Sequence, residues 1–439
     1  MNKLFALFLT GSLLLGIVAG CTPAPAPTEA ELAPAEEMEE PMEEAEEPMT
    51  EKSKVVVWMA GDDARFMMES DIPAMFEEAN PDYEVEIVQL PWDALHDKIV
   101  ASFTGGESPS VSQGADHWVG EFAILGGLEP LDDFKSEMGY QDDDFLPNAW
   151  EHFRYADGVL YAAPFIWESR LLFYRTDLLE EAGFEGPPTN FEEMVEFGKA
   201  LTNGEDQFGV AHQESWLDFH FFSWLLYAVG GDFVNEDFSE CTLTNEAGIE
   251  AITFYKQLYD ENIIPKDPAQ RVETFKGFKE GYYAMAESGA WWFGLLGSQA
   301  PELEGKWDVA LLPEDVTTIT YGHPNPWVVP ASSENKEGAK AWMAFMLQPE
   351  IAAEWADFYG QTPAIKAAFD DPKISDSPEQ QAMLESALRG VNSLHNVPAA
   401  ETITEVVWNM LAEVRDDIKE PEAAAEDTCQ QMNDLLANK

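Results

Sequence analysis

The 439-residue chain has little cysteine and few basic residues, and each shortage excludes a class of protein. Its three cysteines form no Cys-x-x-Cys pair and no Cys/His spacing, so neither a zinc module nor another metal site is predicted. Lys and Arg number 24 against 83 Asp and Glu, a formal net charge of −59. Nucleic acids and anionic surfaces are bound by basic patches, so neither nucleic acid nor a phosphorylated ligand is expected.

The excess of acidic residues has two interpretations that composition leaves open. One is a solvated, self-repelling surface that keeps a soluble protein soluble. The other is adaptation to a saline habitat. With either interpretation we expect a monomer.

A long apolar run lies at the N-terminus, from Leu4 to Val18, after the basic residue Lys3. It is shorter than the roughly 20 residues that span a membrane, and it ends in small residues, which is typical of a secretory signal peptide. Its end, Val-Ala-Gly-Cys, resembles the bacterial lipobox. Residues 1–20 are therefore predicted to be a lipoprotein signal peptide, and Cys21 a lipidated anchor facing the periplasm or cell exterior. An ordinary signal peptide followed by a chance cysteine is the alternative.

Residues 21–53 contain many Glu, Pro and Ala and no aromatic residue. Such a segment buries too little apolar surface to offset the entropy of ordering it, so we predict a disordered stalk. Repulsion between its glutamates would keep it extended.

The remaining chain is long enough for two domains and rich enough in aromatic residues for a substantial core. Short β-branched runs alternate with segments of helical periodicity, which predicts an α/β layered fold. The expected strands include 54–59, 83–89, 111–113, 307–312 and 327–330. The expected helices include 64–79, 92–103, 191–201, 216–229, 247–260 and 336–346, with two more after residue 404.

With Cys21 assigned to the anchor, Cys241 and Cys429 remain, an even number in an oxidising compartment. A disulfide between them is allowed, but spacing alone does not decide whether it forms.

Six segments together resemble the extracellular solute-binding proteins of ABC-type sugar importers, of the maltose-binding type. The best match, Leu172–Met194, has Tyr-x-x-Asp-Leu followed by Ala-Gly, Pro-Pro-Thr and an aromatic residue. Glu334, where the pattern has Lys, and Ser110-Val111, where it has Pro-Asp-Val, depart from it. The other matching segments are 55–63, 126–134, 157–165, 278–292 and 330–347.

The resemblance implies a type II periplasmic-binding-protein-like fold, with two α/β lobes, chain crossovers and a ligand cleft between the lobes. The N-terminal lobe would comprise 54–164 plus 316–365, and the C-terminal lobe 165–315 plus 366–439. It also implies a transport receptor without catalysis or cofactor, which hands a sugar or oligosaccharide to the permease subunits of an ABC importer.

Sugars present apolar C–H faces and a rim of hydroxyls, so a site for them combines aromatic platforms with short polar groups. Several tryptophans of this chain lie beside Asp, Glu or His at expected loop tips. The groups at 62–63 and 113–118 follow expected strands, and ligands bind at such strand ends in α/β sheets. The candidate ligand-binding residues are Asp62, Asp63, Gln113, Asp116, His117, Trp118, Trp167, Glu168, Trp216, Asp218, Trp291, Trp292, His323 and Asn325.

The resemblance places three of these candidates on positions that contact sugar: Asp116 and Glu168 would accept hydroxyl hydrogen bonds and Trp291 would stack on a ring. Asp63 and His117 stand where the maltose type has a basic residue and Arg, which makes maltose itself doubtful as the ligand.

Each assignment has a plainer alternative. Asp62 and Asp63 could cap a helix, His323 could bond a loop carbonyl, and one of Trp291 and Trp292 is expected in the core. The core should also hold Trp224, Trp342 and Trp355.

Two other functions stay open at this stage. Carboxylates beside tryptophans also suit a glycoside hydrolase, with Asp116 and Glu168 as acid and nucleophile. They suit a quaternary ammonium or polyamine ligand as well, through cation–π contacts.

Overall fold

The computed structural model describes residues 52–437, apart from 156, 214–215, 393 and 395–398. The predicted signal peptide, Cys21 and nearly all of the predicted stalk lie outside the described residues. Ser53, expected in the stalk, already belongs to the first strand, where it pairs with Tyr83.

The first sheet has seven strands, in the order β10-β4-β9-β3-β1-β2 with β11 paired to β9. Strand β1 runs parallel to β2 and β3, whereas β9 is antiparallel to both β3 and β4. The sheet is thus parallel on one side and antiparallel on the other. Its strands are β1 (Ser53–Ala60), β2 (Tyr83–Leu90), β3 (Val111–Gln113), β4 (Ala163–Ser169), β9 (Thr320–Val328), β10 (Thr362–Pro363) and β11 (Val391–Asn392).

The second sheet has four strands, in the order β6-β7-β5-β8. Its inner strands β7 and β5 are antiparallel to each other, and β6 runs parallel to β7. The strands are β5 (Leu171–Arg175), β6 (Phe208–Val210), β7 (Tyr283–Ser288) and β8 (Trp307–Leu311).

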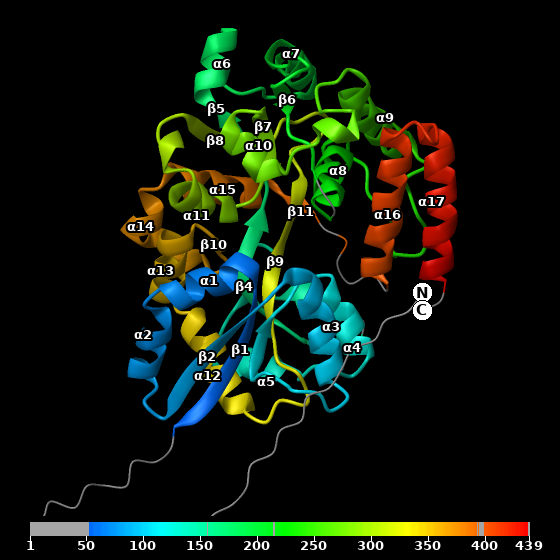
Figure 1. The fold of residues 1–439 in the computed structure, drawn as a ribbon. Coiled ribbons are helices and arrows are strands. Elements are labelled where there is room, and N and C mark those ends of the chain that lie inside the picture. The colour runs from blue at the N-terminus through cyan, green and yellow to red at the C-terminus, as the bar shows by residue number, and fades with distance from the viewer. Residues whose placement is uncertain (1–51, 156, 214–215, 393, 395–398, 438–439) are drawn as a thin grey trace, which may run out of the picture. The chain divides into compact units, whose positions relative to one another are not determined.

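Helices of two groups surround the sheets (Figure 1). Those labelled around the first sheet are α1 (Gly61–Glu69), α2 (Ile72–Ala79), α3 (Trp92–Ser102), α4 (Trp118–Ile124), α5 (Asp132–Glu137), α12 (Lys336–Met346) and α13 (Pro349–Tyr359). The others are α6 (Thr176–Ala182), α7 (Phe191–Leu201), α8 (Trp216–Ala228), α9 (Glu246–Asp260), α10 (Thr274–Glu280), α11 (Trp291–Gln299), α14 (Pro372–Ser375), α15 (Pro378–Arg389), α16 (Ala400–Arg415) and α17 (Pro421–Leu436). Short 3-10 turns lie at 142–144, 151–153, 268–270, 301–303 and 366–370.

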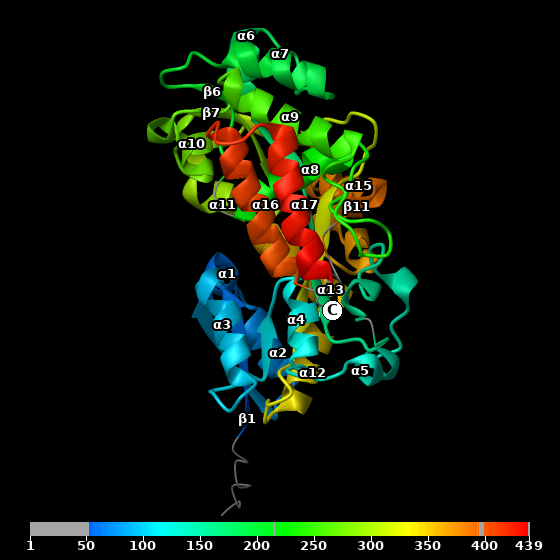
Figure 2. The ribbon, with the colours of Figure 1, turned by 90° about the vertical axis from the view of Figure 1, so that its right-hand side faces the viewer.

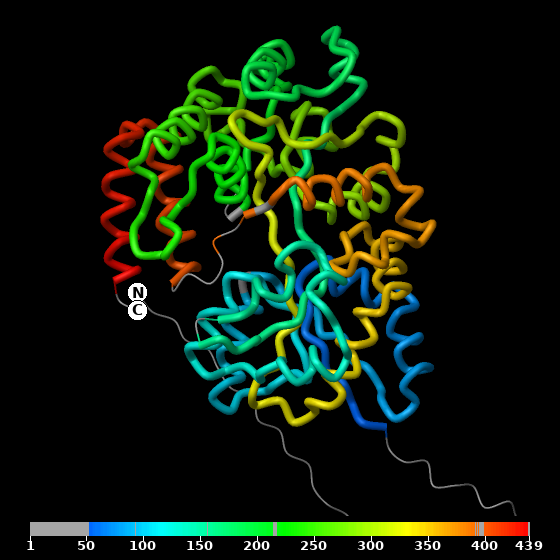
Figure 3. The backbone as a smooth tube through the Cα atoms, turned by 180° about the vertical axis from the view of Figure 1, so that it is seen from behind, coloured from blue at the N-terminus to red at the C-terminus, as the bar shows by residue number. Residues whose placement is uncertain are grey.

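Two strands carry the chain between the sheets. Strand β4 ends at Ser169 and β5 begins at Leu171, so only Arg170 separates a strand of the first sheet from a strand of the second. The return strand β9 lies beside β4, as Figure 1 shows from the front and Figure 3 from behind. Each sheet forms the centre of one lobe. Strand β4 continues in the first sheet beyond residue 164, where the sequence predicted the first lobe to end. The lobe boundaries proposed from sequence stay predictions.

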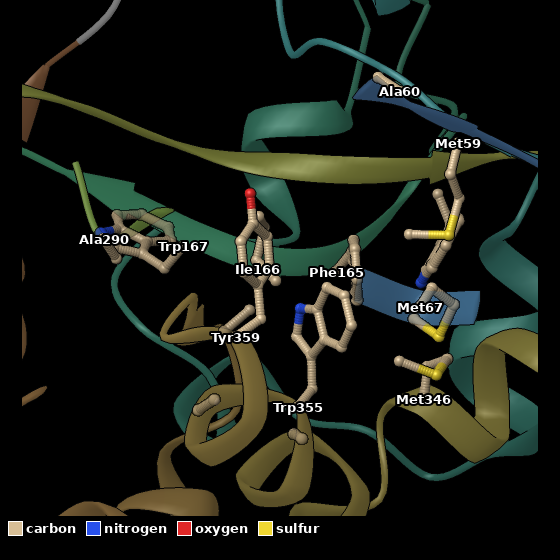
Figure 4. Packing of buried hydrophobic residues seen from close by; sticks show 14 of the residues in the cluster. Met59, Ala60, Met67, Phe165, Ile166, Trp167, Ala290, Met346, Trp355 and Tyr359 are labelled. Atoms are coloured by element: carbon tan, nitrogen blue, oxygen red, sulfur yellow. The ribbon is translucent and has the colours of Figure 1, made fainter. Parts of the chain in front are cut away.

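Two apolar clusters stabilise the lobes. The first surrounds the first sheet and contains Trp342 and Trp355, which are 0 % and 1 % exposed. Figure 4 shows Trp355 and Tyr359 of α13 rising toward Phe165 and Ile166 of β4. The second cluster joins α8, α9, α16 and α17 to the second sheet and contains Trp224, 1 % exposed. The prediction that these three tryptophans are core residues is confirmed.

One predicted helix is in fact two. The segment expected as a single helix over 64–79 forms α1 and α2, separated at Ser70 and Asp71. The Ser70 hydroxyl donates to the Met67 carbonyl and accepts the N–H of Ile72, while Pro73 stands in the first turn of α2. Proline suits a first turn and not a helix interior, so the break lies there.

A disulfide joins Cys241 to Cys429, whose Cα atoms are 5.1 Å apart. It attaches α17 to the loop before α9. Among the described residues, no helix has the length and apolar character that crossing a membrane requires.

Candidate functional site

The carboxyl ends of β1 and β3 hold the first polar group. Gly61 has a φ of +39°, which lets the chain turn from β1 into α1 and puts Asp63 in the first helical turn. Gln113 ends β3; its Nε2 donates to Asp63 Oδ2 at 2.5 Å, and its Oε1 accepts the Ala60 N–H at 3.1 Å. Tyr359 donates its hydroxyl to Asp63 Oδ1 at 2.9 Å. Gln113 therefore connects the two strand ends and positions Asp63.

Asp116 follows β3 and is surrounded by histidines. Its Oδ1 lies 3.1 Å from His117 Nδ1 and 3.4 Å from His323 Nδ1, and its Oδ2 lies 3.0 Å from His152 Nε2. Burial by itself raises the pKa of Asp116, but attraction to His323 and hydrogen bonds from His117 and His152 hold that pKa well below its usual value. Asp116 is therefore a stable buried anion.

His117 is the cation of this group. Burial by itself lowers its pKa, but its hydrogen bonds to Asp116 and Glu401 outweigh burial and raise the pKa to about 10. Burial lowers the pKa of His152, and of His323 to about 4, so both are neutral at pH 7. His323 Nδ1 also lies 3.4 Å from the Pro324 carbonyl oxygen.

The crossing strands contribute a polar face. Glu168 of β4 lies opposite His323 of β9 in the ladder. Because side chains alternate along a strand, Tyr321 and Asn325 share the face of His323. The rings of Tyr321 and His323 are 5.3 Å apart. This face therefore places Glu168 beside His323, which in turn lies next to Asp116.

Arg170, which the sequence analysis did not select, occupies the crossover itself. It is 1 % exposed, and its Nη1 donates to Glu168 Oε2 at 3.2 Å. Its Nε lies 3.0 Å from Glu287 Oε1, and its Nη2 lies 2.8 Å from His220 Nδ1. Since Glu168 belongs to the first sheet and Glu287 to β7 of the second, one guanidinium pairs with both lobes.

The carboxyls near Arg170 resist ionisation. Burial raises the pKa of Glu168 to about 7, against the attraction of Arg170 and with the repulsion of Asp63. Burial raises the pKa of Glu287 to about 7, again against Arg170. Burial also raises the pKa of Asp63, despite its hydrogen bonds to Gln113, Gln361 and Tyr359. Glu168 and Glu287 therefore share one guanidinium, and the charge of Asp63 acts on Glu168.

Trp291 supplies an aromatic surface beside these charges. The Arg170 guanidinium lies 4.7 Å from the centre of one Trp291 ring, a cation–π contact. Trp291 is partly exposed, whereas its neighbour Trp292 is 4 % exposed and packs against Phe173, Phe275 and Phe278. Of the adjacent pair, Trp292 is thus the core residue.

The other candidates lie apart from this group or face away from it. Asp62 forms a surface ion pair with Arg65, and Trp118 packs against Trp92 and His96. Trp167 lies on the face of β4 opposite Glu168, and its indole N–H has no acceptor among the described residues. For Trp216, the structure describes only the backbone, at the start of α8.

Asp218 does not belong to the site. It is 0 % exposed, accepts the Tyr255 hydroxyl at 3.0 Å and pairs with Arg415 Nη1 at 2.9 Å. Its position beside Trp216 at the start of an expected helix suggested a ligand contact, but α8 directs this carboxylate into the second apolar cluster, where it has a structural role.

The structure thus brings together Asp63, Gln113, Asp116, His117, Glu168, Trp291, His323 and Asn325. Sequence reasoning missed Arg170, Glu287, His152, Tyr321 and Glu401, whose importance comes from partners distant in sequence. In the described part of the chain, no three His, Cys, Asp or Glu side chains are placed to hold a metal ion.

Replacing Glu287 by glutamine should stabilise the protein increasingly as pH rises. The folded pKa of about 7 exceeds the ordinary 4.5, so the stability contributed by this carboxyl is complete below pH 4.5 and is lost as pH rises through 7. Glutamine does not titrate. The free energy of unfolding of Glu287→Gln, measured in urea, should therefore gain about 2 kcal/mol on the wild type between pH 5 and pH 8. A difference independent of pH would contradict this; the exposed Glu304→Gln is the control.

Replacing Gly289 by alanine should disrupt the Trp291–Arg170 contact. A Cβ atom on Gly289 would lie 2.0 Å from Trp291 Cζ3 and 2.6 Å from Arg170 Nη1, so both side chains must move. We expect Gly289→Ala to cost about 1–3 kcal/mol in urea unfolding. Gly297, in α11 with open space around its Cβ position, is the matched control; Gly297→Ala should be neutral or slightly stabilising. Equal stability of the two variants would show that the close approach is not needed.

Known proteins resemble this chain in sequence and in fold. A putative binding protein of Brucella abortus is 25% identical over 377 residues, which cover 83% of this chain and 89% of that protein. A maltooligosaccharide ABC transporter solute-binding lipoprotein of Streptococcus pneumoniae is 24% identical, covering 81% and 83%. The solved structure of the sugar-binding protein MalE from Xanthomonas citri superposes with a TM-score of 0.76 at 25% identity, covering 88% of this chain and 98% of that one.

These likenesses confirm the predicted two-lobe α/β fold and the resemblance seen in the sequence. Residues 72–382, most of the described chain, match the family described as bacterial extracellular solute-binding protein. The family and these relatives are binding proteins rather than enzymes. The chain belongs to the bacterial extracellular solute-binding proteins.

Proposed function

We propose that this protein is a membrane-anchored receptor that captures a sugar or oligosaccharide between its lobes and delivers it to the permease of an ABC importer. One observation carries the proposal: buried carboxylates from both sheets gather beside the partly exposed Trp291. Carboxylates form strong hydrogen bonds with hydroxyls, and an aromatic face suits the C–H surface of a sugar ring.

The relatives and the N-terminus support the transport role. The Streptococcus pneumoniae relative is named for maltooligosaccharide transport and is a lipoprotein, and the Xanthomonas citri structure is that of a sugar-binding protein. The lipobox-like sequence before Cys21 would keep the receptor at the membrane after export, with the stalk as its tether. No cofactor is proposed.

A cationic solute is the second candidate, because Glu168 and Glu287 share one guanidinium and Glu168 is also repelled by Asp63. A positive charge placed there would favour their ionised forms. Such a ligand would bind through charge, so its affinity should fall steeply with salt, whereas that of a neutral sugar should change little.

A thermal-shift screen of the full chain tests both candidates. Mono- and oligosaccharides, polyols, betaines and polyamines are added at low and high salt, and a solute that binds only the folded state raises the melting temperature. Trp291→Ala should reduce the shift caused by the sugar that binds. A shift with betaines or polyamines alone would replace the sugar as ligand class, and release of reducing ends would indicate a hydrolase instead.

A further inference from the structure

Helix α16 of the second lobe ends against α4 of the first. Figures 1 and 2 both show the N-terminal end of α16 approaching the helices of the first lobe. Glu401, in the first turn of α16, places its Oε2 2.8 Å from Nε2 of His117, the residue that precedes α4. The Trp118 side chain also hydrogen-bonds Glu401. One carboxylate of the second lobe therefore contacts two consecutive residues of the first.

This contact is an ion pair rather than a neutral hydrogen bond. His117 lies between two carboxylates, with Asp116 Oδ1 3.1 Å from Nδ1 and Glu401 Oε2 2.8 Å from Nε2. Burial by itself raises the pKa of Glu401, but the hydrogen bond and charge of His117 lower it below its usual value. Two anions thus share one cation at the junction of the lobes.

The Glu401 carboxylate is held on a firmly anchored helix. An acidic side chain in the first turn suits the positive end of the helix dipole. Ile403 and Val407 of α16 are fully buried in the second apolar cluster, and Arg415 at its far end pairs with the buried Asp218. When α16 moves, the second lobe must therefore move with it.

His117 in turn belongs to the candidate site. Its partner Asp116 is hydrogen-bonded by His152 as well, so an interaction at Nε2 of His117 acts directly on the group that orients Asp116. The contact therefore couples the relative position of the two lobes to the orientation of Asp116, a carboxylate of the candidate site.

We propose that Glu401 is a positioning residue that latches the second lobe onto His117 of the first lobe before any solute is bound. The latch consists of Glu401, His117 and Trp118. It shifts the empty receptor toward the lobe arrangement in which His117 and Glu401 are in contact, because breaking the contact separates two opposite charges. The proposal goes beyond the transport function and does not depend on which solute is captured.

The expected size of the effect follows from exposure. The side chains of His117 and Glu401 are 25% and 42% exposed, so solvent screens their attraction in part. A lobe equilibrium in such proteins is balanced to within a few kcal/mol. Loss of the latch should therefore change the ratio of closed to open molecules by about two- to fivefold.

Small-angle X-ray scattering of the ligand-free full chain tests the latch. Glu401→Gln and His117→Gln should each increase the radius of gyration, and the double variant should add nothing, because both remove the same interaction. Glu405→Gln, one turn further along α16 and exposed, removes the same charge away from His117 and should match the wild type. Glu401→Lys, which brings two positive charges together, should open the lobes furthest.

Several results would overturn the proposal. An unchanged radius of gyration in Glu401→Gln would mean that the contact does not bias the lobes. A lower melting temperature with no change in radius would give Glu401 only a structural role. An increase of the same size in Glu405→Gln, or additive increases in the double variant, would replace the specific pair by a general effect of charge.

Discussion

Replacing Arg415 by methionine should lower the free energy of unfolding by about 3–5 kcal/mol at pH 8. Arg415 Nη1 lies 2.9 Å from Asp218 Oδ2, and Asp218 is 0 % exposed. Methionine fills much of the arginine volume but leaves the Tyr255 hydroxyl as the hydrogen-bond donor to the Asp218 side chain among the described residues. The cost is that of an uncompensated charge in an apolar cluster. Urea unfolding measures it.

The loss should be smaller at pH 5. Burial raises the pKa of Asp218 to about 6 even though Arg415 attracts its ionised form. Without Arg415 that pKa must rise further, so the carboxyl is protonated at pH 5 and carries no unpaired charge. Arg389, paired with Glu314 and Glu385 at the surface, is the control: Arg389→Met should cost no more than about 1 kcal/mol. Equal losses in the two variants, or a loss independent of pH, would contradict the buried pair as the cause.

Removing the disulfide should have a comparable effect. The bridge between Cys241 and Cys429 joins residues 188 positions apart, so it restricts a large part of the unfolded chain. The double variant Cys241→Ser, Cys429→Ser is expected to lose about 2–5 kcal/mol of unfolding free energy in urea. The wild type in reductant should lose the same amount.

The double variant is its own control, since reductant should leave its stability unchanged. The loop of Cys241 keeps a second connection to α17, because the Cys241 N–H donates to Asn433 Oδ1 at 2.7 Å. The variant should therefore fold to the same secondary structure, which circular dichroism would verify. A wild type indifferent to reductant would mean that the bridge does not contribute to stability.

Sequence reasoning found the residues of the site that chain order places at strand ends. Asp63 and Asp116 follow β1 and β3, and neighbouring parallel strands end at the same edge, so their convergence follows from local pattern. Trp224, Trp342 and Trp355 lie on apolar helical faces and are core residues for the same local reason.

The residues that sequence reasoning missed depend on contacts across the fold. Arg170 has no motif around it; it becomes central because β7 brings Glu287 to it from 117 positions away. In the sequence, Glu401 is one of several acidic residues in a helix, and only the fold shows that it pairs with His117. Asp218 was predicted as a site residue because it is near an aromatic residue in the sequence. Its structural role is evident only from its ion pair with Arg415 in the folded protein. Each outcome depends on tertiary contacts that local pattern does not encode.

The pairing of β3 with β9 has a consequence for when the protein can fold during its synthesis. Ser112 lies opposite Val328, so the first sheet is incomplete until more than two hundred further residues have been made. High contact order slows folding, since distant segments must meet before their pairing is rewarded. We therefore expect the nascent chain to remain unfolded during most of its synthesis. Export through a narrow translocation channel requires an unfolded chain. The late pairing of β3 with β9 would therefore also leave time for export before the protein folds.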